Sequence, residues 1–318
     1  PFTKRSFKTY QMNISSELFA NAQQFPFKTA FIENNKKYTY KQTAQMTKHA
    51  AEVLRAHGIK EKSNIILLEP VSVKMYCTLM AVWSIGAAVT IFDPSATPEY
   101  IEKCLTRVSP EFFVGCRKAF LLKLKLRALN KIKNNMLTDE LFSDEAFKNE
   151  DLSFSGSADC SSFPALITFT SGTTGIPKVT VRTQDFLLTQ LDVISQTMPY
   201  SGSDIDIAVL PVFTVANIAE GITTVIPGKA LGALSGGDPS DMIKLIRKNN
   251  VTRITASPAI IGAIADALAK RGKTISSMTS LNAGGGPIFP YLIKNVGKAF
   301  PDSALKLVYG STEAESIA

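Results

Sequence analysis

Histidine and cysteine are scarce in this sequence, and their scarcity limits the chemistry that the chain can carry. The 318 residues include two histidines, His49 and His57, and four widely spaced cysteines that form no C-x-x-C pair. Zinc sites need several of these residue types at close spacing, so no zinc site is readable. A Ser/His/Asp grouping for nucleophilic catalysis is also missing. We interpret the cysteines as small core residues and expect a reducing, cytoplasmic location.

A strong excess of one charge and a clear membrane span are absent too. The formal net charge is +8, spread along the chain, and does not by itself indicate a nucleic-acid partner. No apolar stretch follows the basic residues 1–10, so no signal peptide is visible. Residues 75–92 are uncharged over 18 positions, which is long enough to suggest a span. Gly86 and the Asp93-Pro94 pair favour a core helix followed by a core strand instead.

Residues 117–133 are rich in leucine and in basic side chains (Lys123, Lys125, Arg127, Lys131 and Lys133). A basic amphipathic helix of this kind could lie on an anionic membrane or near an acyl-chain entrance. We favour a surface helix whose lysines extend from an apolar stripe, and leave peripheral membrane contact as the second interpretation. The acidic and polar residues 138–162 predict a linker.

Apolar periodicity and turn residues predict an α/β protein with mostly parallel sheets and helices packed on them. Its two subdomains are expected at residues 1–162, including the linker, and 163–318. Strands are expected at residues 29–33, 37–40, 64–69, 87–92, 111–114, 165–169, 179–182, 205–210, 252–256, 280–283 and 305–309. Helices are expected over residues 16–23, 41–56, 75–86, 98–108, 117–133, 186–198, 217–225, 239–249, 258–270 and 290–300. We interpret His57 as a residue at a helix end rather than a catalyst.

A run of hydroxyls and glycines at residues 168–178 predicts a polyphosphate site. The hydroxyls are neutral donors, the glycines allow the backbone to approach a ligand, the lysine adds a positive charge, and no acid is present. The residues are Thr170, Ser171, Gly172, Thr173, Thr174, Gly175 and Lys178. The segments on both sides have the pattern of strands, so this loop joins strand to strand. The nucleotide P-loop G-x-x-x-x-G-K-[ST] joins a strand to a helix and has different spacing, which excludes that class. An ordinary Ser/Thr/Gly turn is the alternative.

Two further motifs follow predicted strands, where open α/β sheets place their ligands. Gly284, Gly285, Gly286 and Pro287 expose backbone, so that a flat ring or an acyl chain can lie against it. In the segment Tyr309, Gly310, Ser311, Thr312 and Glu313, the tyrosine can stack on a base and the threonine can donate to a phosphate. The glutamate can hold the Mg²⁺ that accompanies ATP, although a solvated surface carboxylate is the ordinary alternative for it.

In this order, the three motifs resemble those of the adenylate-forming enzymes, the acyl-CoA synthetase and ligase superfamily: T-S-G-T-T-G-x-P-K, then G-G-x-P, then Y-G-x-T-E. Residues 83–94 and 210–213 are similar to segments of that family as well, and the resemblance extends from about residue 29 to residue 318. Within the family, residues 182–188, 213–227 and 309–318 look most like fatty-acyl-CoA synthetase-like members, including the olefin-pathway β-lactone synthetases.

The resemblance implies an enzyme that activates a carboxylic acid, fatty or otherwise apolar, with ATP. The acyl-adenylate then passes to CoA or another acceptor. The loop at residues 170–178 would hold the β- and γ-phosphates, with Lys178, Thr312 and Glu313 as the catalytic group. Residues 284–287 and Tyr309 would border adenine, with Gly310 and Ser311 beside them, Thr312 would contact the α-phosphate, and Glu313 would bind Mg²⁺. The pocket for the tail of the acid would be lined by Phe213, Thr214, Asn217, Ile218 and Gly221.

This sequence also departs from the family pattern. Val179 replaces the usual glycine after the loop lysine, and Thr214 stands where histidine is common. The 318 residues stop before the family's ribose-binding Asp motif and before its C-terminal domain with the catalytic lysine. We therefore expect this stretch alone to be nearly inactive. A non-catalytic nucleotide- or acyl-binding homologue remains the alternative.

Overall fold

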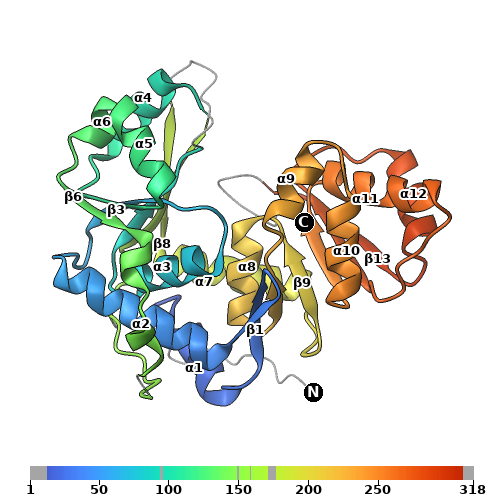
Figure 1. The fold of residues 1–318 in the computed structure, drawn as a ribbon, viewed down its shortest axis with the longest axis horizontal. Helices are drawn as coiled ribbons and strands as arrows, with labels where there is room; N and C mark the ends of the chain where they lie inside the picture. The colour runs from blue at the N-terminus through green and yellow to red at the C-terminus, as the bar shows by residue number, and fades with distance from the viewer. Residues whose placement is uncertain (1–12, 94–95, 149, 158, 171–176, 311–318) are drawn as a thin grey trace. The chain divides into compact units, whose positions relative to one another are not determined.

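The computed structural model describes residues 13–93, 96–148, 150–157, 159–170 and 177–310 (Figure 1). The fold is α/β, and the chain divides into two compact units whose segments alternate along the sequence. Unit 1 consists of Pro1–Ala20, Ala44–Pro70 and Lys74–Thr189, and unit 2 of Asn21–Thr43, Val71–Val73 and Gln190–Ala318. The division between residues 162 and 163 stays a prediction about subdomains.

Unit 1 is built on a six-stranded sheet with the order β6-β5-β3-β4-β7-β8. Every neighbouring pair is parallel except the hairpin of β7 and β8. The strands are β3 (Asn64–Leu68), β4 (Ala88–Thr90), β5 (Phe112–Gly115), β6 (Asn134–Leu137), β7 (Pro164–Thr170) and β8 (Lys178–Thr183). The central strands are apolar on both faces, as expected for parallel strands covered by helices on both sides.

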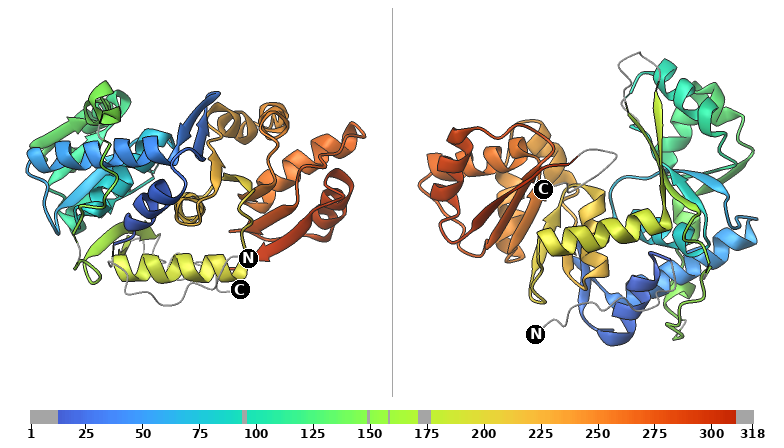
Figure 2. Two further views of the ribbon diagram at one scale, coloured as in Figure 1. Left: turned by 90° about the horizontal axis from the view of Figure 1, so that it is seen from below. Right: turned by 180° about the vertical axis from the view of Figure 1, so that it is seen from behind.

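The helices of unit 1 lie on both faces of this sheet (Figures 1 and 2). Strand β4 lies on one side of β3 and β5 on the other, so the connections β3–α3–β4 and β4–α4–β5 run in opposite directions along the sheet. Right-handed crossovers therefore place α3 and α4 on opposite faces. The face carrying Ile66 and Phe113 packs against α4, α5 and α6. The helices are α2 (Tyr40–Ala56), α3 (Val73–Ser84), α4 (Pro98–Val108), α5 (Arg117–Lys125) and α6 (Arg127–Asn130), with 3-10 turns at Thr138–Leu141 and Asp144–Phe147.

Unit 2 is built on a seven-stranded sheet with the order β13-β12-β11-β9-β10-β1-β2. Its strands are β1 (Thr29–Glu33), β2 (Lys36–Thr39), β9 (Ile205–Ala208), β10 (Thr223–Val225), β11 (Arg253–Ala256), β12 (Ser280–Gly284) and β13 (Ala304–Val308). The β1–β2 hairpin is antiparallel and turns through Asn34 and Asn35 at φ values of 48° and 68°, as a two-residue hairpin loop requires. The other neighbouring strands are parallel.

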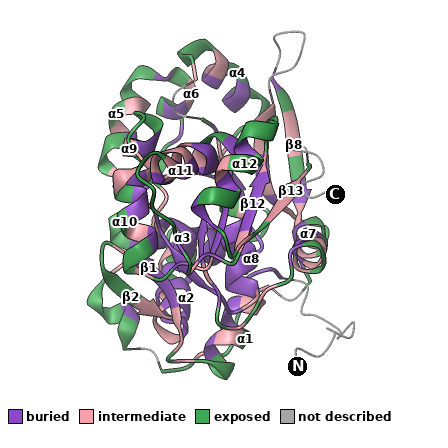
Figure 3. Ribbon diagram, turned by 90° about the vertical axis from the view of Figure 1, so that its right-hand side faces the viewer, coloured by how far each residue is buried: buried purple, intermediate pink, exposed green. Residues whose placement is uncertain are grey.

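The two faces of the unit 2 sheet differ in character. One face carries Ile207, Ile254 and Leu281 and forms an apolar core with α9 to α12. Pairing in register places Asp206 beside Arg253, and Thr255 beside Asn282, on the other face. These four polar residues are buried, and β12 is coloured as buried in Figure 3. The remaining helices are α1 (Ser16–Gln24), α7 (Gln184–Thr197), α8 (Pro211–Ala219), α9 (Lys229–Ser235), α10 (Ser240–Lys248), α11 (Pro258–Lys270) and α12 (Pro290–Ala299).

The single helix expected over residues 117–133 is wrong. The chain forms two short helices that are interrupted at Leu126, whose backbone is extended at φ −114° and ψ 114°. The break turns Leu126 into the core, where it is 1% exposed. Strand β6 follows within residues 134–137, where two asparagines gave no strand pattern.

The helix expected over residues 217–225 is also wrong. Residues up to Ala219 belong to α8, which begins at Pro211 because proline suits the first turn of a helix. Gly221, at φ +69°, then reverses the chain, and the β-branched residues 223–225 form strand β10.

The uncharged segment at residues 75–92 is confirmed as core helix and core strand, α3 and β4, with Gly86 between them at φ +79°. In the part of the chain that the structure describes, no helix has both the length and the apolar character needed to cross a bilayer.

We predict that Leu129→Ala lowers the free energy of unfolding by about 2–5 kcal/mol, because Leu129 of α6 is 0% exposed and its truncation leaves a cavity. Leu124→Ala on α5 is the control, since that side chain is 76% exposed, and should change stability by less than about 0.5 kcal/mol. Urea denaturation of both variants measures the difference. Equal losses would contradict the placement of the two leucines.

Candidate nucleotide site

The β7–β8 hairpin places two predicted phosphate ligands opposite each other. Thr170, the last residue of β7, pairs in register with Lys178, the first residue of β8. Directly opposed residues of an antiparallel pair project from the same face, so the hydroxyl and the ammonium lie on one side of the hairpin. Lys178 is exposed and Thr170 half-buried. The arrangement offers a cation and a neutral donor at the loop end of the hairpin.

A second cation on this face was not among the predicted site residues. Arg182 projects from the same face of β8 as Lys178, four positions further on, and is buried. Its Nη1 donates to Oγ1 of Thr168 at 3.2 Å. The alternation of β8 was sufficient to place Arg182 on the face of Lys178, but a buried cation in a strand was not recognised as a signal.

The middle of the predicted loop lies outside the described residues: Ser171, Gly172, Thr173, Thr174 and Gly175. The same is true of Ser311, Thr312 and Glu313. Their assigned roles remain predictions. Among the residues that the structure does describe, no group of three or more His, Cys, Asp or Glu side chains is arranged to hold a metal ion.

The glycine motif lies at the carboxyl edge of the unit 2 sheet. Gly284 ends β12 and pairs with Val308 of β13, and a Cβ at Gly284 would lie 2.7 Å from the Val308 carbonyl oxygen. Only glycine fits this close approach. Gly285 follows at φ +79°, a conformation that favours glycine. Tyr309 comes directly after Val308 and is 68% exposed, so its ring is available beside the glycine loop.

An open depression of about 530 Å³ adjoins this loop within unit 2. Gly285, Gly286 and Pro287 form one wall, and the first turn of α11, including Pro258, forms another. The rings of Phe289 and Tyr291 stack at its rim, with centroids 6.0 Å apart and an interplanar angle of 10°. Bare backbone next to exposed aromatic rings is an environment in which a flat heterocycle can lie.

The residues predicted for the tail pocket are brought together on α8. Phe213, Thr214, Asn217 and Ile218 are all buried, and Gly221 follows the helix at positive φ. The Nδ2 atom of Asn217 donates to Oδ2 of Asp206 at 3.0 Å and to Oγ1 of Thr224 at 3.1 Å. Asn217 therefore joins α8 to the polar face of the sheet.

Buried charges continue this polar network. The guanidinium of Arg253 lies 3.6 Å from Asp204 and 3.9 Å from Asp206, measured between nitrogen and carboxylate oxygen. It also donates to the carbonyl oxygens of Met198 and Pro199, just after α7, at 3.4 and 3.0 Å. Its cationic carbon lies 4.2 Å from the centre of the Tyr200 ring. Charged residues inside the strands formed by residues 205–208 and 253–256 were the available signal for this cluster.

Burial raises the pKa of the Asp206 carboxyl to about 6, and the negative charge of Asp204 adds to the shift. Arg253 and the hydrogen bond from Asn217 act in the opposite direction. Within the described residues, Oδ1 of Asp206, Oδ1 of Asn217 and Oγ1 of Thr214 have no hydrogen-bond partner. The buried surroundings of α8 therefore contain unpartnered polar atoms as well as apolar side chains.

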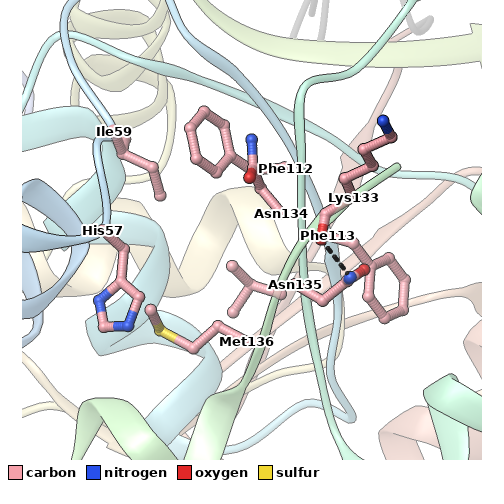
Figure 4. Close-up of a pocket in the computed structure, with 9 residues that line it drawn as sticks. His57, Ile59, Phe112, Phe113, Lys133, Asn134, Asn135 and Met136 are labelled. Carbon is pink, nitrogen blue, oxygen red and sulfur yellow. Dashed lines mark hydrogen bonds between the residues drawn. The ribbon is translucent and has the colours of Figure 1, made fainter. Parts of the chain in front are cut away.

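A separate pocket in unit 1 has a volume of about 220 Å³ and includes His57 (Figure 4). Its lining otherwise consists of the apolar residues Ile59, Phe112, Phe113, Val114 and Met136 and of the segment at residues 133–135. No carboxylate or thiol lies in the lining to work with the imidazole, whose Nδ1 is 2.9 Å from the Val53 carbonyl oxygen. This geometry agrees with the interpretation of His57 as a helix-end residue.

Comparison with known proteins identifies the family to which a chain with these features belongs. The family model for AMP-binding enzymes matches residues 18–318. The olefin β-lactone synthetase of Stenotrophomonas maltophilia is 24% identical over 287 residues, covering 88% of this chain and 51% of that protein. The 4-coumarate–CoA ligase 1 of Solanum tuberosum is 25% identical over 317 residues, covering 95% of this chain and 57% of that protein. The chain thus spans about half the length of the curated relatives that it matches.

Solved structures support the fold assignment. The N-terminal domain of FACL13 from Mycobacterium tuberculosis superimposes with a TM-score of 0.81 at 19% identity, covering 95% of this chain and 76% of that one. The complex of VinN with L-aspartate also gives a TM-score of 0.81, at 14% identity, with coverages of 95% and 76%. The chain belongs to the AMP-binding enzyme family, which confirms the resemblance to adenylate-forming enzymes.

We predict that Gly284→Ala lowers the free energy of unfolding by about 1–3 kcal/mol, because the new Cβ forces β12 and β13 apart. Gly286→Ala is the matched control, since its nearest neighbour would be 3.6 Å away, at Cδ of Pro258. Thermal unfolding of both variants compares them. A larger loss for Gly286→Ala would show that the loop is arranged differently.

A second prediction concerns pH. The pKa of Asp206 in the folded protein, about 6, is above the value of about 3.9 for an unfolded chain, so the folded state binds the extra proton between these limits. The free energy of unfolding should therefore fall as pH rises from 4 to 6 and remain lower above 6. We expect the wild type to lose about 2 kcal/mol more than Asp206→Asn between pH 4 and 7.5. Asp241→Asn, an exposed control, should follow the wild-type profile. If the profile of Asp206→Asn were identical to that of the wild type, the raised pKa assigned to Asp206 would be wrong.

Proposed function

We propose that the protein activates a carboxylic acid with ATP. A carboxylate oxygen attacks the α-phosphorus, a new P–O bond forms, the bond to the bridging oxygen breaks, and pyrophosphate leaves with the electron pair. The product is an acyl-adenylate. The reaction needs positioning and neutralisation of charge rather than a side-chain nucleophile.

The observation that carries the proposal is the hairpin pairing of Thr170 with Lys178 in a chain of the AMP-binding family. A lysine at an exposed strand start is suited to a phosphate oxygen, and the threonine opposite adds a neutral donor. The glycine loop is a separate support, because Gly285 and Gly286 present backbone without side chains to the open depression in unit 2.

We assign the remaining roles by the family pattern. The phosphates would be held by Thr170, Ser171, Gly172, Thr173, Thr174, Gly175 and Lys178. Gly284, Gly285, Gly286, Pro287, Tyr309, Gly310 and Ser311 would form the adenine side. Thr312 would contact the α-phosphate and Glu313 would bind Mg²⁺, whose charge would offset that of the phosphates.

The acid that we propose has an apolar tail. Phe213 and Ile218 of α8 supply an apolar surface, and Gly221 follows the helix. Thr214, which is also buried on α8, would supply a hydroxyl to the carboxylate end of the acid. CoA is the proposed acceptor, and 4-coumarate–CoA ligases are among the relatives. Intramolecular closure of a β-hydroxy acid is the second candidate, since olefin β-lactone synthetases are relatives as well.

A non-catalytic nucleotide- or acyl-binding module is the alternative to an enzyme. A nucleotide-binding module would also bind ATP, and an acyl-binding module would bind the acid, but only the enzyme would return labelled pyrophosphate to ATP when an acid is present. Exchange between ATP and pyrophosphate therefore distinguishes the two. A panel of short, long and aromatic acids tests the substrate class, and absence of exchange by the full-length protein with every acid would contradict the proposed activity.

We predict that Lys178→Ala weakens ATP binding by about tenfold to a hundredfold, the loss expected for one charge-assisted hydrogen bond. The melting temperature should stay close to that of the wild type, because Lys178 is exposed. Lys298→Ala removes an exposed lysine of α12 outside the proposed site and serves as the control. Titration calorimetry and thermal unfolding are the measurements. Unchanged affinity, or a large loss of melting temperature, would exclude the assigned role.

A further inference from the structure

Helix α5 exposes leucines where a surface helix normally exposes polar residues. Its outward residues are Arg117, Lys118, Leu121, Leu124 and Lys125, spaced as one stripe along the helix. Leu121 is 63% exposed and Leu124 is 76% exposed. We call these five residues the α5 stripe. Its centre is apolar and both its ends are cationic.

The inner face of α5 is already filled by other side chains. Ala119 is buried, and the Phe120 ring packs edge-on against Phe113 of β5, with centroids 5.1 Å apart at 77°. Lys123 points inward, and its Nζ donates to the Ile132 carbonyl oxygen at 2.8 Å and to the side chain of Asn135. Rotation of α5 to bury Leu121 and Leu124 would break these contacts. The exposure of the leucines is therefore set by the packing of the helix.

The surroundings of the stripe are strongly basic. Residues 112–137 contain seven Lys and Arg and no Asp or Glu. Two acids lie nearby: both carboxylate oxygens of Glu102 accept from the Ala128 amide at 3.0 Å, and Asp139 pairs with Lys74 and also feels the charge of Arg117. Within the described residues, Lys118, Lys125 and Arg127 have no ion-pair partner. Their charge is thus free to act on an external anion.

We propose that the α5 stripe binds an anionic lipid surface. Leu121 and Leu124 enter the boundary between headgroups and acyl chains. Lys118 and Lys125 of the stripe, with Arg127 at the start of α6, lie at the level of the lipid phosphates. Exposed leucines can enter the boundary between headgroups and acyl chains, and basic side chains next to them are attracted to anionic lipids. The short stripe makes this contact peripheral and reversible.

Co-sedimentation with vesicles tests the proposal. The protein is mixed at 50 mM NaCl with vesicles of phosphatidylcholine that contain 30% phosphatidylglycerol, or with pure phosphatidylcholine. We expect binding to the anionic vesicles only, and a marked decrease at 500 mM NaCl as the charges are screened. No binding to the anionic vesicles at low salt would overturn the proposal.

Two pairs of variants locate the contact. Lys118→Gln with Lys125→Gln should weaken binding about tenfold or more. Lys294→Gln with Lys298→Gln removes the same charge from exposed positions of α12 and should leave binding near the wild-type level. Leu121→Gln with Leu124→Gln should also weaken binding, whereas Ile293→Gln, at an exposed apolar position of α12, should not.

Circular dichroism of each variant confirms that it is folded, and sedimentation velocity reports association between copies. Equal losses for the α5 and α12 variants would show that binding follows net charge alone and would overturn the assignment to α5. Self-association that depends on Leu121 and Leu124, without vesicle binding, would identify the stripe as a protein interface instead and would equally overturn it.

Discussion

The hydrogen-bonded register between neighbouring strands is the constraint on which the proposed site depends. It sets Thr170 opposite Lys178 in one unit and Gly284 opposite Val308 in the other. A shift of one residue in either pair would turn the relevant side chains to the opposite face of the sheet. The position of Lys178 is therefore determined by the whole β7–β8 ladder and not by the loop alone.

Much of the fold was predictable because local signals agreed with tertiary burial. Proline at the start and glycine after the end marked α11, whose observed bounds match the expectation for residues 258–270. Paired asparagines marked the β1–β2 turn. The errors arose where tertiary contacts overrode the pattern. Leu126 interrupts a continuous helical pattern because its side chain fills the core under α4.

The distinction between local signals and tertiary contacts also applies to the candidate site. Thr170 and Lys178 could be proposed as phosphate ligands because their residue types match the chemistry of a phosphate. Arg182 could have been placed on the face of Lys178 from the alternation of β8, but the partner of Asp206 could not be predicted, because it depends on which strands become neighbours. Asp206 lies next to Arg253 through the pairing of β9 with β11, strands that are more than 40 residues apart. A charge within an apolar strand signals a buried partner but does not reveal which residue that partner is.

The contacts of Arg253 limit the substitutions that the protein can tolerate at this position. One planar group meets two carboxylates, two main-chain carbonyl oxygens and the face of an aromatic ring. Lysine carries the same charge but concentrates its donors on one atom and has no flat surface to stack. The usual conservative exchange of arginine for lysine is therefore unsuitable at this position, and the segment after α7 depends on a guanidinium for its attachment to β11.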